Sequence, residues 1–409
     1  MIAEIVHRFL LKRWQTGAIS VNPMNKLPFD TFVDRRNTDS IKWQKFTEGV
    51  IPMWVADMEF AVPHAISRAM SERIQHPIFG YTAAPQSLAN CVMEYCTAKH
   101  NWQTDAEDFF WVPGVLPALT AACRTAGKAG DEIIVLTPVY HPLLHIPEKV
   151  DRTRVDVPMT YTKDEQNQSG NWAIDFDALE NAFTSRTAAL LLSSPHNPMG
   201  VMFTEEELYK VSALCARHNT LLVSDEIHCD LILSKTKKHI PTALAAKEHH
   251  ESVLTIMSPS KTFNLAGANC SFAYTSNTEI LQKISNECLY TVPLVPTLSY
   301  CAAEAAYRDG WEWHSQLIDY LRGNHDYLHS AINKSELLSM DKLDATYLAW
   351  IDTSRLMSED ANDFFKSAGV GLSPGSQFGN KHYQRLNFAC SREQLEEGVS
   401  RMLRAIDKS

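Results

Sequence analysis

The stretch VLTIMSPSKTFNLAG, residues 253–267, joins a short hydrophobic run to a serine-flanked lysine. Val253–Met257 is short and rich in β-branched and apolar residues, which predicts a buried strand. Lys261 follows this strand closely, with Ser258 and Ser260 beside it. In open α/β sheets, ligands bind outside the carboxyl ends of the strands. Lys261 is therefore expected to lie at a ligand site, although a lysine taken alone is more often an ordinary surface residue.

The sequence around this lysine alternates strand-like and helix-like segments. Strands are predicted at Glu132–Leu136, Ala188–Ser193 and Leu221–Ser224, and Glu205–His218 has the apolar spacing of a crossover helix. This alternation predicts an α/β fold, with a mostly parallel central sheet covered by helices on both faces.

The pattern changes beyond Trp311, where a long polar helix is predicted to about residue 333. Short strands are then expected at 345–351 and 385–389, which indicates a second, smaller α+β lobe. We therefore divide the chain into an N-terminal extension (1–24), a small domain (25–74 with 311–409) and a large domain (75–310).

Composition excludes several classes of protein. The 409 residues carry a net charge of -10, with 45% apolar and 21% charged residues, which is typical of a globular protein and argues against a nucleic-acid footprint. No apolar run is long enough to span a bilayer, and the nine scattered cysteines suit a cytoplasmic protein with reduced thiols. No metal site is expected, because His141 and His145 lack a third ligand and Pro142 disfavours a regular helix there.

Other strand ends also carry functional side chains. Asp225 ends the 221–224 strand, Asn197 lies in the turn after Ser193, and Tyr140 follows the 132–136 strand. Gly114 precedes a predicted helix whose first backbone amides could bind a phosphate. Each signal alone is weak, because Asp is a common helix cap and Asn-Pro a common turn.

Taken together and in order, Gly114, Tyr140, Asn197, Asp225, Lys261 and Arg385 give the chain a family resemblance from about Phe29 onward. It resembles the fold-type I pyridoxal-5′-phosphate (PLP) enzymes of the class I/II aminotransferase superfamily, whose central sheet is of the seven-stranded type. Within that superfamily it is most similar to the MalY/PatB group of cysteine-S-conjugate (cystathionine) β-lyases. The motifs that carry this resemblance are MWVADM (53–58), FGYT (79–82), PHNP (195–198), SDEIH (224–228), SPSKTFN (258–264) and RLNFA (385–389).

The resemblance implies a role for each site residue. Lys261 would be the catalytic residue and hold PLP as a Schiff base, while Arg385 would bind the α-carboxylate of an amino-acid substrate. It also implies a homodimer, in which Tyr81 reaches the phosphate in the neighbouring subunit. The other expected cofactor-binding residues are Val115, Leu116, Ser258 and Ser260 at the phosphate, and Tyr140, Asn197, Asp225 and His228 around the ring.

Two positions bear on the choice of reaction. His228 and Asn269 stand where aminotransferases of the superfamily usually carry Tyr and Arg, and both departures resemble the lyase group. The sequence thus favours a carbon–sulfur β-lyase that releases a thiol, pyruvate and ammonia. An aminotransferase is the alternative enzyme, and a regulatory binding protein with the PLP fold is the alternative outside enzymes.

Overall fold

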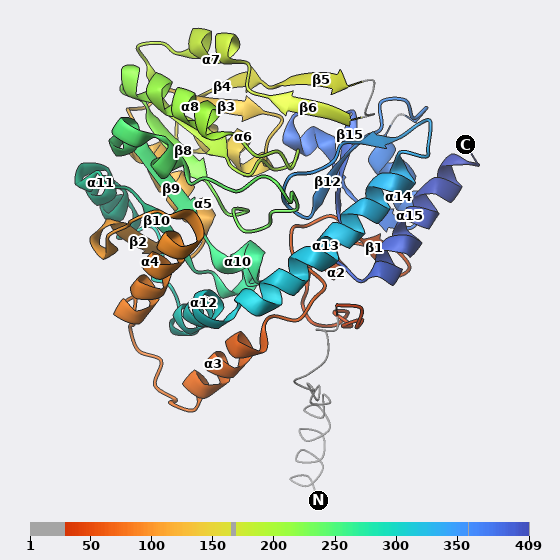
Figure 1. The fold of residues 1–409 in the computed structure, drawn as a ribbon, viewed down its shortest axis with the longest axis horizontal. Coiled ribbons are helices and arrows are strands. Elements are labelled where there is room, and N and C mark those ends of the chain that lie inside the picture. Colours follow the sequence, from red (N-terminus) through yellow and green to blue (C-terminus); the bar gives the residue numbers. More distant parts are fainter. Residues whose placement is uncertain (1–28, 165–168, 359, 409) are drawn as a thin grey trace, which may run out of the picture.

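A seven-stranded sheet forms the centre of the molecule in the computed structural model, which describes residues 29–164, 169–358 and 360–408 (Figure 1). Its strands lie in the order β2-β10-β9-β8-β7-β3-β4. Strands β4, β3, β7, β8 and β9 pair in parallel, and β10 pairs antiparallel with both β9 and the edge strand β2. The bounds are β2 (Phe109–Val112), β3 (Glu132–Thr137), β4 (Thr153–Pro158), β7 (Thr187–Ser193), β8 (Leu221–Asp225), β9 (Val253–Met257) and β10 (Ser271–Tyr274).

Both faces of this sheet are buried, which explains why its strands read as nearly continuous hydrophobic runs. Along β3, Ile133 and Val135 pack into one hydrophobic cluster and Ile134 and Leu136 into another, because successive side chains point to opposite faces. The first cluster includes helices α5 (Val115–Thr125), α6 (His141–Lys149) and α11 (Thr278–Cys288). The second includes α4 (Gln86–His100), α7 (Phe176–Ala182) and α8 (Glu205–Arg217).

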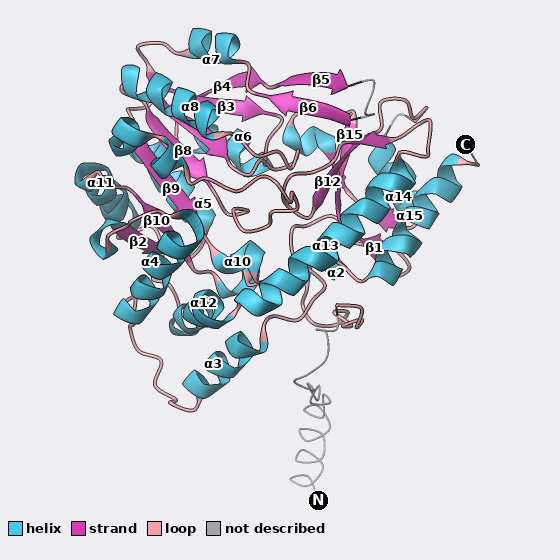
Figure 2. Ribbon diagram, in the orientation of Figure 1, coloured by secondary structure: helices cyan, strands magenta, loops and turns pink. Residues whose placement is uncertain are grey.

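A smaller antiparallel sheet lies beside the large one. Its strands follow the order β11-β12-β15-β14, with bounds Ser339–Met340, Leu348–Asp352, Tyr383–Asn387 and Ser373–Pro374. Its hydrophobic cluster includes residues of α13 (Trp311–Ile332), α14 (Ala361–Ser367) and α15 (Arg392–Ile406). Figure 2 shows this mixed lobe next to the central sheet. The other α-helices are α2 (Ile41–Gln44), α3 (His64–Ile74), α9 (Thr242–Ala245), α10 (Pro259–Thr262) and α12 (Thr297–Asp309). Two short strand pairs complete the described sheets: β1–β13 (Ile51–Pro52, Val370–Gly371) and β5–β6 (Thr160–Asp164, Ser169–Ala173).

The α/β fold with a mostly parallel sheet is confirmed, and the predicted strands are present with small shifts of their ends. One local expectation was wrong. His141 and His145 do lie on one helix, α6, because Pro142 occupies its first turn, where a missing N–H costs no hydrogen bond; a second proline, Pro147, lies near its end. The division into an extension and two domains stays a prediction, and residues 1–24 lie outside the described residues.

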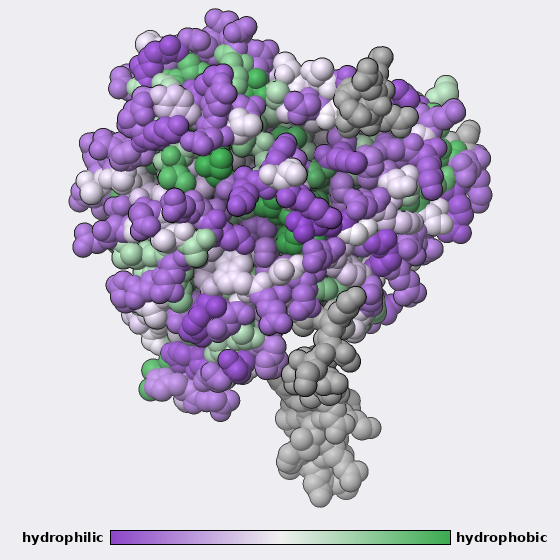
Figure 3. All heavy atoms as spheres, in the orientation of Figure 1, coloured by the Kyte–Doolittle hydropathy of each residue, from purple (hydrophilic) through white to green (hydrophobic). Residues whose placement is uncertain are grey.

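Two classes of feature are absent from the described ranges. No helix in them is both long and apolar enough to cross a membrane. The same residues contain no group of three or more His, Cys, Asp or Glu side chains placed to hold a metal ion. The face in Figure 3 is mostly hydrophilic, with apolar residues in small groups.

Candidate active site

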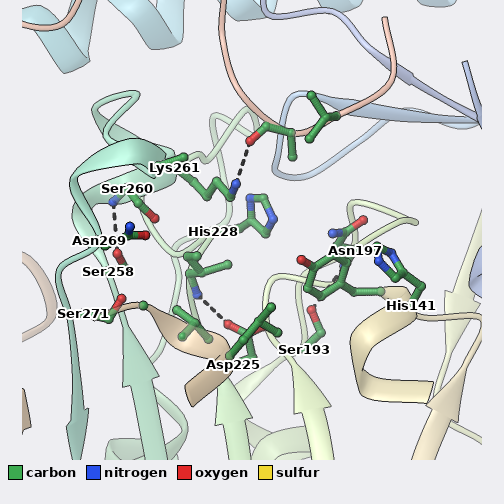
Figure 4. Close-up of a pocket in the computed structure, with 18 of the residues that line it drawn as sticks. His141, Ser193, Asn197, Asp225, His228, Ser258, Ser260, Lys261, Asn269 and Ser271 are labelled. Carbon is green, nitrogen blue, oxygen red and sulfur yellow. Dashed lines mark hydrogen bonds between the residues drawn. The ribbon is translucent and has the colours of Figure 1, made fainter. Parts of the chain in front are cut away.

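One pocket lies at the carboxyl ends of the parallel strands, and the small sheet closes its other side. Figure 4 shows Lys261 on α10, Asp225 at the end of β8 and His228 in the turn after β8 converging on it, with Asn197 and His141 on the opposite wall. The pocket brings together all the predicted site residues but one: Val115, Leu116, Tyr140, Asn197, Asp225, His228, Ser258, Ser260, Lys261 and Arg385. The exception is Tyr81, which is outside the pocket lining and fully exposed.

Lys261 reaches the pocket from the short helix α10, which directly follows β9. Ser258 caps this helix, since its Oγ accepts from the Ser260 N–H at 3.2 Å, and the same hydroxyl donates to the Cys270 carbonyl at 2.8 Å. The Lys261 amine donates to the Ala56 carbonyl at 2.7 Å. Burial lowers the pKa of Lys261 to about 8, against the opposing effect of the nearby Asp57 carboxylate. The neutral fraction near physiological pH is therefore much larger than that of an ordinary lysine, which lets this amine act as a nucleophile and a base.

Asp225 lies at the last position of β8, beneath the pocket. Its Oδ1 accepts from the Ile227 N–H at 3.2 Å, and the side chain is otherwise shut off from water. Burial raises the pKa of Asp225 to about 7. A cationic ring nitrogen beside it would favour the ionised carboxylate, so this position suits a pyridinium partner.

His228 is neutral in this setting. Burial lowers its pKa to about 3, and the Lys261 and Arg385 charges act in the same direction. Its Nδ1 is buried and has no hydrogen-bond partner among the described residues. His228 therefore offers an uncharged ring nitrogen to a bound molecule rather than a positive charge.

Arg385 enters from β15 of the small sheet. Its Nη1 donates to Asn197 Oδ1 and its Nη2 to the Trp54 carbonyl, each at 3.0 Å, while its buried Nε finds no partner in the described chain. No carboxylate of those residues pairs with it, and burial lowers its pKa to about 10. The guanidinium stays charged at neutral pH, so a carboxylate brought by a ligand would supply the missing counter-charge.

The opposite end of the pocket is suited to a phosphate. Gly114 has φ +118°, which L side chains rarely adopt, and it starts α5 without a side-chain cap. The first amides of α5, at Val115 and Leu116, therefore need an acceptor from elsewhere. Ser271 Oγ lies buried in the same pocket and has no partner within the described residues.

These groups show whether PLP would fit the pocket. Helix amides and Ser271 Oγ suit its phosphate, Asp225 its ring nitrogen, and Lys261 its aldehyde. The residues present fit the cofactor. The predicted phosphate contact of Ser258 has less support, because its hydroxyl hydrogen is already donated to the Cys270 carbonyl.

Residues 54–58, which we call the carbonyl segment, begin in the site, where Trp54, Val55 and Ala56 line the pocket. Side chains donate to each of its five successive carbonyls. Trp54 O accepts from Arg385, and Ala56 O accepts from Lys261 and from Tyr347 Oη at 3.1 Å. The others accept from Asn387 (Val55 and Asp57), from Lys42 (Asp57), and from Asn264 and Arg35 (Met58).

Sequence reasoning missed several members of the site. Ser271 opens β10, and its position after SPSKTFN could have suggested it. His141 was considered only as a metal ligand, yet it lines the pocket, and burial lowers its pKa. Ala56 acts through its backbone carbonyl and Phe378 through its ring, and no residue-type pattern marks either role.

Known proteins share this arrangement. The model of the family described as "Aminotransferase class I and II" matches residues 48–402 of this chain. Cystathionine beta-lyase PatB from Bacillus subtilis (strain 168) is 35% identical, over 92% of this chain and 99% of that protein. The crystal structure of OvoB has a TM-score of 0.89 with 35% identity, covering 93% of this chain and 99% of its own. The PLP-bound C-S lyase from Staphylococcus hominis has a TM-score of 0.86 with 28% identity, covering 93% and 99%.

The central sheet, the lysine after β9 and the aspartate at the end of β8 define the class, which is the fold-type I PLP-dependent enzymes. The chain belongs to the aminotransferase class I and II family.

Proposed function

We propose that this enzyme is a PLP-dependent carbon–sulfur β-lyase that cleaves cystathionine or other cysteine S-conjugates to a thiol, pyruvate and ammonia. The convergence of Lys261, Asp225 and Arg385 in one pocket carries this proposal. The names of the relatives support the choice of a lyase, since PatB and the Corynebacterium glutamicum relative are both cystathionine beta-lyases.

Each residue then has a distinct task. Arg385 binds the substrate α-carboxylate and so orients the amino acid. Asp225 stays ionised and holds a positive charge on the ring nitrogen, while Asn197 and Tyr140 keep the ring in place. The first amides of α5, with Ser260, hold the phosphate. When bound, PLP supplies an electron sink for the pair left at Cα after proton removal.

Lys261 removes that proton. One N–H of its amine is held by the Ala56 carbonyl at 2.7 Å, so the lone pair of the neutral amine is free to point elsewhere, into the pocket. A pKa near 8 keeps enough neutral amine for this step at physiological pH.

The leaving group decides between elimination and transamination. A thiol has a pKa of about 8 to 9, so a thiolate departs from Cβ with little acid assistance. Transamination instead needs a proton delivered to the cofactor carbon.

We further propose a homodimer in which Tyr81 completes the site of the neighbouring subunit. Tyr81 and Tyr290 are 101% and 93% exposed, and apolar neighbours are exposed with them. The two segments lie together, since Thr82 Oγ1 is 2.6 Å from Thr297 Oγ1. Such a patch is typical of an interface. Its other members are Ile78, Phe79, Leu289 and Leu294. We place the enzyme in the cytoplasm, which suits its nine free cysteines.

Subunit mixing tests the dimer. Lys261→Ala and Tyr81→Ala subunits, each weakly active alone, should regain up to roughly a quarter of wild-type activity when mixed, because half of the random dimers contain one intact composite site. A mixture no more active than its components would mean that Tyr81 does not act across the interface.

The reaction itself is tested by comparing two substrates. L-Cystathionine should release pyruvate, without any keto-acid acceptor, at least about tenfold faster than L-alanine is transaminated with 2-oxoglutarate. Transamination at the higher rate would establish the aminotransferase alternative. Absence of both activities in the PLP-loaded protein would favour a regulatory binding protein.

A further inference from the structure

Phe378 lies directly against the guanidinium of Arg385. The guanidinium carbon is 4.5 Å from the ring centroid, and Phe378 is 1% exposed and lines the pocket. A buried guanidinium over an aromatic face is attracted to the ring and restricted in orientation. Since Arg385 pairs with no carboxylate of the described chain, this ring is one of few groups that stabilise its charge.

Phe378 is itself firmly held. It ends the short helical turn Gly375–Phe378, and its ring packs edge-on against Trp350 at 5.5 Å. Trp350 stacks on Tyr383 at 4.9 Å and is the cross-strand neighbour of Arg385. The Phe378 carbonyl accepts from the Val139 N–H at 3.0 Å, next to Tyr140. Phe378 thus joins the small sheet that carries Arg385 to the loop that carries Tyr140.

We propose that Phe378 is a positioning residue that fixes the plane of the Arg385 guanidinium and so sets the affinity for the substrate carboxylate. This inference rests on the proposed role of Arg385 in the lyase. The ring lies against the guanidinium, and the hydrogen bonds to Asn197 and Trp54 hold Nη1 and Nη2. The buried Nε has no partner among the described residues, so the guanidinium still lacks an acceptor that a substrate carboxylate would supply. Without the ring, the Arg385 side chain would sample other orientations. Substrate binding would then have to order that side chain, which weakens the affinity.

The expected loss of affinity for the substrate carboxylate follows from this restriction of Arg385. Ordering one long side chain on binding corresponds to about a three- to tenfold weaker affinity. The loss should fall on ligands with a carboxylate and spare ligands that bind through an amine alone.

The test compares L-alanine with ethylamine, its counterpart without the carboxylate, by the absorbance change each produces on binding to the PLP-loaded enzyme. Phe378→Leu should raise the Kd of L-alanine about three- to tenfold and leave that of ethylamine within about twofold. Phe378→Tyr, which keeps the aromatic face, should restore the wild-type Kd. Phe365→Leu removes an equally buried ring on α14, away from the pocket lining, and should change neither value.

If Phe378→Leu raised the Kd of L-alanine and of ethylamine by the same factor, Phe378 would only shape the pocket wall, and the inference would be overturned. An unchanged Kd for L-alanine would overturn it as well. If Phe378→Leu fails to fold, Phe378→Met provides the same comparison. Failure of the underlying proposal would look different: Arg385→Ala would then leave the Kd of L-alanine unchanged.

Discussion

The acid–base behaviour of Lys261 gives a sharp prediction, with pH as the perturbation. Only the neutral amine can attack the PLP aldehyde, and burial lowers the Lys261 pKa from 10.5 to about 8. The neutral fraction is then about 1% at pH 6, about 9% at pH 7 and about 90% at pH 9. The rate of covalent cofactor attachment should therefore rise about 90-fold from pH 6 to 9 and then level off.

Attachment is followed by absorbance after PLP is mixed with the cofactor-free protein over this pH range. PLP itself ionises over this range, so the reaction of Nα-acetyl-lysine with PLP is measured at each pH as a reference. The reference rate is first divided by the neutral fraction of the Nα-acetyl-lysine amine at that pH. Each rate for the protein is then divided by this corrected reference rate. Lys261→Ala should show no covalent attachment at any pH. A corrected rate that still rises about eightfold between pH 9 and 10 would mean that Lys261 keeps its ordinary pKa of 10.5.

The same shift affects stability. Between about pH 8 and 10.5 the unfolded chain binds a proton at this lysine that the folded chain does not, so the free energy of unfolding rises with pH. Below pH 8 the buried charge lowers the free energy of unfolding by about 3 kcal/mol, because the Lys261 pKa falls from 10.5 to about 8 on folding. Lys261→Met should therefore stabilise the cofactor-free protein at pH 7 in urea unfolding, and a destabilised variant would contradict the assigned burial effect.

Three further changes test the other parts of the site. Asp225→Ala should bind PLP but eliminate pyruvate from cystathionine at least about 100-fold more slowly, because the ring nitrogen loses its charged partner; unchanged turnover would show that the ring partner is misassigned. Arg385→Lys should raise KM for amino acids more than it changes PLP content, since lysine cannot bind a carboxylate bidentately; an equal KM would remove Arg385 from the substrate site. Gly114→Ala should weaken PLP binding several-fold in a fluorescence titration, because φ +118° is strained for any L side chain and the first amides of α5 would move; wild-type affinity would show that these amides are not needed.

The strand ends were the predictable part of this site. Lys261, Asp225 and Asn197 each follow a hydrophobic run, and the topology of parallel strands brings such positions to one edge of the sheet. Arg385 could be placed only through the family resemblance, because it comes from a second sheet whose orientation the sequence pattern does not specify.

Other features of the site depend on atoms that residue patterns do not report. The Ala56 carbonyl is more than 200 residues from Lys261 and acts through the backbone, which every residue shares. Ser258 was expected at the phosphate, but its position as the cap of α10 directs its hydroxyl to the Cys270 carbonyl. By residue type Pro142 disfavours a helix at 141–145, but in the first turn of α6 a proline is tolerated, and its place in the turn is not visible from its type.

The carbonyl segment has a consequence for how this stretch of chain can vary. Its contacts use main-chain oxygens, so substitutions at Val55 or Ala56 would leave the hydrogen-bonding atoms in place. A deletion or insertion of one residue would instead bring a different oxygen to Arg385 or Lys261, since these two donors engage carbonyls two positions apart. Among descendants of a common ancestor, spacing between residues 54 and 58 should therefore be preserved more strictly than side-chain identity.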